Sequence, residues 1–199
     1  MIAPNGCIDM TRKKSAKNEG LSWKAFKAEW AIWYAGKRGI FWFSLKFGAL
    51  VAVLYTLLLI PGCERMLFLY LKAYAGLTHA VLNALGVDCQ LSDVTIISPR
   101  FSMAIRRGCD AVEPTWLFCA AVLSYPGPFG RKAVGILIGI ILLQVLNLVR
   151  ILSLYFIGVY FPSFFNTAHL EIWPTVFIIT AIALMVAWIE WTRRYDLPR

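Results

Sequence analysis

The sequence is poor in charge and in metal-binding side chains, and both shortages exclude classes of protein. Only 16% of its 199 residues are charged and 59% are hydrophobic, whereas a soluble domain is about 45–50% apolar. The core of a water-soluble domain could not bury this excess of hydrophobic residues. The five cysteines include no Cys-x-x-Cys pair, and His79 and His169 lie 90 residues apart, so we expect no structural zinc site. No ligand cluster for another metal or an organic cofactor is present either, so none is expected.

The hydrophobic residues form runs that are long enough to cross a membrane. A bilayer core of about 30 Å requires about 20 apolar residues per helix. Residues 41–60, 133–155 and 172–190 meet this length, and residues 108–125 form a shorter run with a polar start. These four runs predict an all-α polytopic membrane protein with about four transmembrane helices.

A fifth run, residues 66–87, is long but amphipathic. Its polar and small residues recur every three or four positions and form one stripe on an apolar helix, namely Lys72, Gly76, His79, Asn83 and Gly86. We expect an interfacial or re-entrant helix here. A fifth span remains the alternative, because the run is long enough to cross.

The net charge of +9 is concentrated at the ends of the predicted helices. Eight basic residues lie within 11–38, and two further pairs are Arg131–Lys132 and Arg193–Arg194. Such clusters hold membrane ends in the cytoplasm, so nucleic-acid binding is not expected and both termini are predicted to be cytoplasmic. We divide the chain into a basic tail with an interfacial helix (1–38), a membrane-embedded domain (39–194) and a second tail (195–199). The first apolar run begins too late for a signal peptide.

This topology places residues 88–107 on the outer face of the membrane. Residues 94–97 and 101–105 have strand character and flank Ser-Pro-Arg at 98–100, which predicts a short β-hairpin leading into Cys109. Cys63 and Cys89 would share this oxidising side. Both a disulfide between them and two unpaired thiols are compatible with the sequence.

Cys109 stands where the run 108–125 begins, after Arg106 and Arg107. A helix N-terminus and nearby cations lower the pKa of a thiol, and the thiolate is the reactive form. Gly108 leaves room for a substrate backbone, and Glu113 follows at a spacing that would orient a partner. A cysteine that is merely packed at a helix start is the alternative interpretation.

Two further polar groups are predicted near the same membrane face. Arg150 lies three residues after Asn147 at the outward end of one span, so the two share a helix face. His169 lies just before the last span and has the chemistry of a general acid or base. Alternatively, Arg150 extends its side chain to the lipid headgroups, and His169 is only a polar anchor at the interface. Together, however, Cys109, Arg150 and His169 supply a nucleophile, an oxyanion-stabilising cation and a proton carrier, as acyl transfer requires.

These three segments resemble the exosortase/archaeosortase family. They are Arg-Arg-Gly-Cys-Asp-Ala-Val-Glu at 106–113, Leu-Asn-Leu-Val-Arg-Ile at 146–151 and Ala-His-Leu at 168–170, in that order. The resemblance covers residues 63–194 and is greatest to the exosortase H branch, which shares Leu-Gly-Val at 85–87. Many relatives have Cys-Ser-Gly where this chain has Cys109, Asp110 and Ala111, and Pro114 is also unusual.

The resemblance implies a membrane-embedded cysteine transpeptidase of the cell (inner) membrane, with its active site at the outer face. Cys109 would be the nucleophile, Arg150 the oxyanion or substrate-positioning group and His169 the acid/base, supported by Asn147, Glu113 and Gly108. The expected partners are the lipid bilayer and exported proteins whose C-terminal tail carries a motif, a transmembrane helix and a basic cluster. An amine acceptor or water would release the processed protein from the enzyme. A non-catalytic membrane scaffold and a small transporter are the alternatives, although the halves show no convincing inverted repeat.

Overall fold

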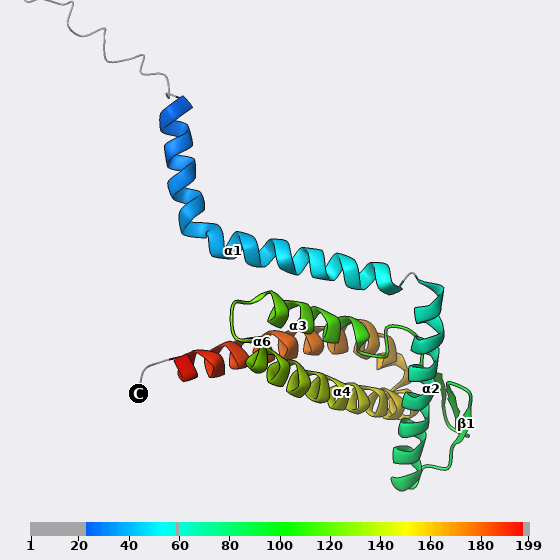
Figure 1. Cartoon of the computed structure of the whole chain (residues 1–199). Coiled ribbons are helices and arrows are strands. Elements are labelled where there is room, and N and C mark those ends of the chain that lie inside the picture. The colour runs from blue at the N-terminus through cyan, green and yellow to red at the C-terminus, as the bar shows by residue number, and fades with distance from the viewer. Residues whose placement is uncertain (1–22, 59, 197–199) are drawn as a thin grey trace, which may run out of the picture. The chain divides into compact units, whose positions relative to one another are not determined.

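The computed structural model describes residues 23–58 and 60–196. Most of the predicted basic tail, residues 1–22, lies outside this range, as do residues 197–199. The chain divides into two compact units, Met1–Trp42 and Phe43–Arg199, with the boundary inside helix α1. The second unit holds all the elements that follow α1 (Figure 1). The long helices of the described residues are α1 (Trp23–Leu58), α2 (Pro61–Ala84), α3 (Val112–Ser124), α4 (Phe129–Tyr160) and α6 (Trp173–Asp196), and the three-residue helix α5 (Phe165–Thr167) lies between the last two.

In the described part of the chain, three helical stretches are long and apolar enough to cross a membrane: Gly36–Leu57, Phe129–Tyr160 and Pro162–Tyr195. They confirm the spans predicted at 41–60, 133–155 and 172–190. The fourth predicted span, 108–125, is only the shorter apolar helix α3. At 1.5 Å per residue, its 13 residues reach about 20 Å, which is less than the bilayer core of about 30 Å. Its predicted first residues instead form an irregular loop.

Helices α3, α4 and α6 pack through small residues. Gly135 and Gly139 of α4 are buried, and a Cβ atom at Gly139 would lie 2.0 Å from the Phe118 ring of α3. A Cβ atom at Gly135 would lie 2.2 Å from the Trp188 ring of α6. In a membrane, where lipid is as apolar as leucine, such close approach gives helices much of their attraction. Because these glycines have no side chain, the rings of Phe118 and Trp188 pack directly against α4.

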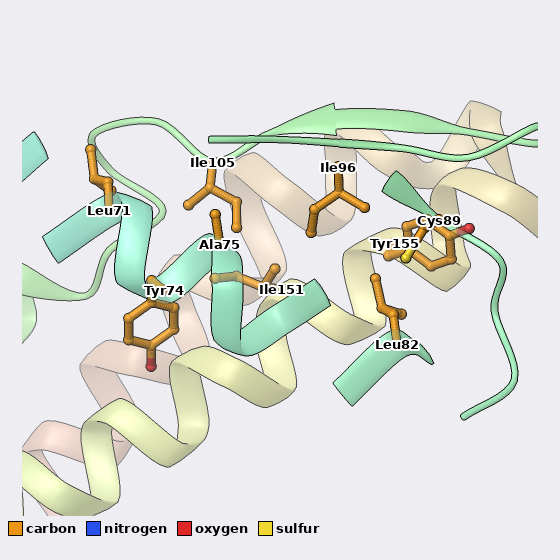
Figure 2. Close-up of a cluster of buried hydrophobic side chains, with 9 residues drawn as sticks. All are labelled: Leu71, Tyr74, Ala75, Leu82, Cys89, Ile96, Ile105, Ile151 and Tyr155. Carbon is orange, nitrogen blue, oxygen red and sulfur yellow. The ribbon is translucent and has the colours of Figure 1, made fainter. Parts of the chain in front are cut away.

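A small antiparallel sheet follows α2, with β1 (Gln90–Ser92), β2 (Thr95–Ile97) and β3 (Ser102–Ala104) in the order β1-β2-β3. The predicted hairpin is confirmed as β2 and β3. We did not predict β1, because Gln-Leu-Ser contains no β-branched or aromatic residue. Ile96 of β2 and Ile105, just after β3, point from the sheet toward Ala75 of α2 and Ile151 of α4 (Figure 2). The sheet is thus anchored to the helices by a buried apolar cluster.

The polar stripe of α2 faces the segment around β1. Lys72 forms an ion pair with Asp93 at 3.2 Å. His79 Nε2 lies 3.0 Å from the Cys89 carbonyl, and the Cys89 thiol donates to Asn83 Oδ1 at 3.3 Å. Three residues of the predicted polar stripe, Lys72, His79 and Asn83, therefore contact protein. Among the described cysteines, Cys63 and Cys89 are both free thiols, so no disulfide joins them.

Candidate active site

A loop between β3 and α3 carries Cys109, and two left-handed residues shape this loop. Gly108 has φ +89° and Ala111 has φ +53°. The left-handed region suits glycine, but it costs an alanine about 1–2 kcal/mol. Such strain persists only where the surroundings hold the backbone, and it is concentrated at functional sites. The Cys109 N–H donates to the Arg106 carbonyl at 3.0 Å and closes the turn.

Side chains from two helices hold this loop by its carbonyl groups. The carbonyls of residues 108, 109 and 110 accept hydrogen bonds from Arg150 Nη1 (3.1 Å), Asn147 Nδ2 (3.0 Å) and Tyr70 Oη (2.9 Å), respectively. Irregular backbone at membrane depth must be satisfied by protein groups, because lipid offers no hydrogen bonds. The three donors therefore make the irregular loop possible and define its position.

His169 lies beside the thiol. Its Nε2 atom is 3.9 Å from Cys109 Sγ. The histidine belongs to a π-helical turn, Ala168–Ile172, which precedes α6 and is preceded by two short turns, Pro162–Phe164 and Phe165–Thr167. Single π-turns occur frequently at functional sites. The ring stacks on Phe165 with 5.8 Å between centroids and 17° between planes, which orients it toward the loop.

Arg150 is 6% exposed, and its guanidinium lies 5.6 Å from the centre of the Phe177 ring of α6. One of its nitrogens, Nε, is buried and has no hydrogen-bond partner. Within the described residues only four buried side-chain polar atoms lack a partner, and Asn147 Oδ1 and His169 Nδ1 are two of the others. Native proteins rarely leave such atoms unpaired without a functional reason. Three of the four thus belong to residues that surround Cys109.

Burial has the largest effect on the pKa of the Cys109 thiol. Burial raises the pKa of Cys109, and the nearby Asp110 carboxylate adds to this effect, while the Arg150 guanidinium and the hydrogen bond with Arg106 oppose it. From the sequence we expected the helix N-terminus and the cations to dominate. The cation whose charge lowers this pKa is Arg150, whereas the prediction named Arg106 and Arg107. Asp110 Oδ1 accepts the Val112 N–H at 3.2 Å and so occupies the start of α3. A thiol in this setting requires a base, and the adjacent base is His169.

The structure brings five of the six predicted site residues together: Gly108, Cys109, Asn147, Arg150 and His169. Glu113 is the exception. It is exposed in the first turn of α3, and within the described residues no hydrogen bond or ion pair joins it to the other five. The prediction assumed a helix running from Cys109, whereas α3 begins only at Val112, after the left-handed Ala111. Cys109 and Glu113 are therefore not one turn apart on the same helix, although they are four positions apart in the sequence.

Sequence reasoning missed Tyr70. Its hydroxyl binds the Asp110 carbonyl from α2, 40 residues earlier in the chain. Nothing in local spacing links these two positions. The only available signal was a tyrosine hydroxyl on an apolar helix, which must find a partner when it is buried.

A family model described as transmembrane exosortase matches residues 19–188. The match covers well over half of the chain and includes Cys109, Arg150 and His169. No curated protein matches the chain. No solved structure matches it either.

Proposed function

This chain belongs to the transmembrane exosortase family, and from that premise we propose that it is a membrane-embedded cysteine peptidase or transpeptidase. Its substrates are exported proteins whose C-terminal sorting tail consists of a recognition motif, a transmembrane helix and a basic cluster. The observation that carries the proposal is the 3.9 Å approach of Cys109 Sγ to His169 Nε2. A nucleophile within reach of its base is the geometric requirement of covalent catalysis.

The first step forms a tetrahedral intermediate on Cys109. Cys109 transfers its proton to His169 Nε2, and the sulfur attacks the carbonyl carbon of the scissile peptide bond. The carbonyl oxygen becomes an oxyanion beside Arg150, whose Nη1 is engaged with the Gly108 carbonyl and whose Nε–H is available to donate. Donors already in place in a water-poor site stabilise such charge strongly, because nothing needs to reorganise.

The intermediate then breaks down and releases the tail, which leaves the rest of the substrate attached to Cys109 as a thioester. A further attack releases that protein. As the carbon–nitrogen bond breaks, His169 returns its proton to the departing amine, which leaves with the membrane helix of the substrate. An acceptor amine or water then attacks the thioester, loses a proton to His169 and restores the Cys109 thiol. Attack by an amine is transfer and attack by water is hydrolysis, and the same residues serve both.

We propose that both termini are cytoplasmic and that the Cys109 loop lies at the outer face. The basic clusters support this topology. Arg131 at the start of α4 donates to the Thr192 carbonyl of α6 at 3.1 Å, next to Arg193 and Arg194. The two basic ends therefore meet, as expected if both lie in the cytoplasm. Arg150 and His169 lie in the opposite halves of the same two helical stretches.

The test is cleavage of a co-expressed, tagged substrate that carries such a sorting tail. Cys109→Ala should abolish tail removal, and His169→Ala and Arg150→Ala should reduce it at least a hundredfold, the scale of a lost acid/base or oxyanion donor. Cys119→Ala is the matched control, because this partly buried thiol lies on α3 away from the loop. Variants are compared at equal abundance in the membrane. Undiminished cleavage by Cys109→Ala would rule out the assigned nucleophile and favour the scaffold interpretation.

A further inference from the structure

We propose that Tyr70 is a positioning residue for the nucleophile, acting together with Gln144. This inference rests on the proposed function only in taking Cys109 as the nucleophile. Tyr70 lies on α2 and Gln144 on α4, and among the described residues no hydrogen bond joins either side chain to the thiol. They act on the backbone that carries it, through the Asp110 carbonyl.

The hydroxyl of Tyr70 lies between two groups. It is 2.9 Å from the Asp110 carbonyl oxygen and 2.6 Å from Gln144 Oε1. A hydroxyl has one hydrogen, and a carbonyl oxygen can only accept. Both contacts are satisfied at once when the amide of Gln144 is rotated by 180°, which exchanges its oxygen and nitrogen. Its nitrogen then donates to Tyr70 Oη, and Tyr70 donates to Asp110.

Thr115 is compatible with this orientation of the amide, because a hydroxyl can donate or accept. Its hydroxyl lies 3.4 Å from the other terminal atom of Gln144. With the amide rotated, Thr115 donates to the Gln144 oxygen, and a continuous relay runs from Thr115 through Gln144 and Tyr70 to the loop. Every member of the relay then has a partner, as buried polar networks require.

The position of Tyr70 along the loop explains why it would matter. Arg150 and Asn147 hold the carbonyls of Gly108 and Cys109, both from α4. Tyr70 holds the next carbonyl from a different helix, so it is the one of these three donors that ties the loop to α2. The left-handed Ala111 follows immediately, and its conformation relies on such restraint. Without the hydroxyl, we expect Cys109 Sγ to leave its 3.9 Å distance from His169.

The chain offers a closely matched control in Tyr74, one turn further along α2. Its hydroxyl also donates to α4, at the Gln144 backbone carbonyl, and the two rings pack with centroids 5.4 Å apart. Tyr74→Phe therefore removes a hydroxyl from the same helix pair, and the link of this hydroxyl to the Cys109 loop is indirect, through the Asn147 side chain. Tyr70→Phe keeps the ring and its packing and removes only the hydroxyl, with its bonds to the Asp110 carbonyl and to Gln144.

The experiment measures alkylation of Cys109 by iodoacetamide in the intact chain in detergent micelles, from pH 6 to 10. The modified peptide is quantified by mass spectrometry. Tyr70→Phe should slow alkylation at pH 7 about tenfold, since small misplacements of reacting groups have effects of this size or larger. Its pH profile should approach that of His169→Ala. In a His169→Ala background, Tyr70→Phe should change the rate less than twofold, because the pairing it supports is already lost.

Equal effects of Tyr70→Phe and Tyr74→Phe would overturn the proposal, as would an unchanged effect of Tyr70→Phe in the His169→Ala background. Faster alkylation would also overturn it, because it would report a merely loosened structure. The readout is independent of cleavage. If the wild type cleaves no sorting tail but the alkylation pattern holds, the positioning role stands and the proposed function fails. If cleavage requires Cys109 but Tyr70→Phe behaves like Tyr74→Phe, the function stands and the positioning role fails.

Discussion

Cys109 Sγ and His169 Nε2 lie 3.9 Å apart although 60 residues separate them in the chain. One comes from a strained loop before α3 and the other from a π-helical turn before α6. Helix α4 lies between them in the sequence and supplies Arg150 to the same site. Because three separate elements contribute, the chemistry depends on how α3, α4 and α6 pack together.

The reactivity of Cys109 should rise with pH beyond the ordinary thiol range. Burial raises its pKa, so its protonated form persists above the usual cysteine value of about 8.5. The midpoint of alkylation against pH should lie above that value. Arg150→Ala should move it higher still, since the guanidinium lowers this pKa, while Arg150→Lys should preserve much of the effect. A midpoint below the ordinary value in the wild type would show that the cations dominate over burial.

Asn147→Asp should disrupt the loop with almost no change in side-chain shape. The Asn147 nitrogen donates to the Cys109 carbonyl at 3.0 Å, and a carboxylate cannot donate there. Leaving a buried carbonyl unpaired costs about 1–3 kcal/mol. Thermal unfolding in detergent should therefore show a lower midpoint, and sorting-tail cleavage should fall. Glu113→Gln, a comparable change at an exposed position, should alter neither measurement. An unchanged midpoint for Asn147→Asp would contradict this role.

Gly139→Ala should destabilise the helix bundle. The added methyl would lie 2.0 Å from the Phe118 ring, and overpacking of this kind costs about 1–3 kcal/mol. Gly130→Ala is the control in the same helix, because no described atom lies within 4 Å of its Cβ position. The unfolding midpoint should fall for Gly139→Ala and stay level or rise slightly for Gly130→Ala. Equal midpoints would mean that the Phe118 ring moves aside without loss.

Gly108→Ala isolates the effect of backbone conformation at the nucleophile. No described atom lies within 4 Å of the new methyl, so steric crowding is not introduced, but φ is +89°. We expect a loss of about 1–2 kcal/mol from the conformation alone. Gly76→Ala in α2 also has open space and an ordinary helical backbone, so it should be tolerated. The comparison is made by thermal unfolding, and a loss shared by both variants would refute the conformational explanation.

The order of motifs along the chain was enough to identify most of the candidate site. Cys109, Asn147, Arg150 and His169 stand out because polar groups at membrane depth are costly and therefore rarely incidental. Glu113 lies apart from the other five residues for a local reason: the helix was assumed to begin at Cys109, whereas a left-handed alanine delays its start to Val112. Such a conformation depends on restraint from neighbouring helices, so spacing alone does not reveal it.

The sequence by itself determined the membrane class, three long spans and the order of the reactive residues. Hydrophobic run length and charge placement are local properties, and the bilayer thickness converts them directly into helices. Only the tertiary structure decided that the Cys109 thiol is buried enough for its pKa to rise, and that Tyr70 reaches the Asp110 carbonyl. It also decided that the stripe on α2 contacts protein around β1. Burial and hydrogen bonding between distant segments arise from packing, and no local pattern in the chain encodes them.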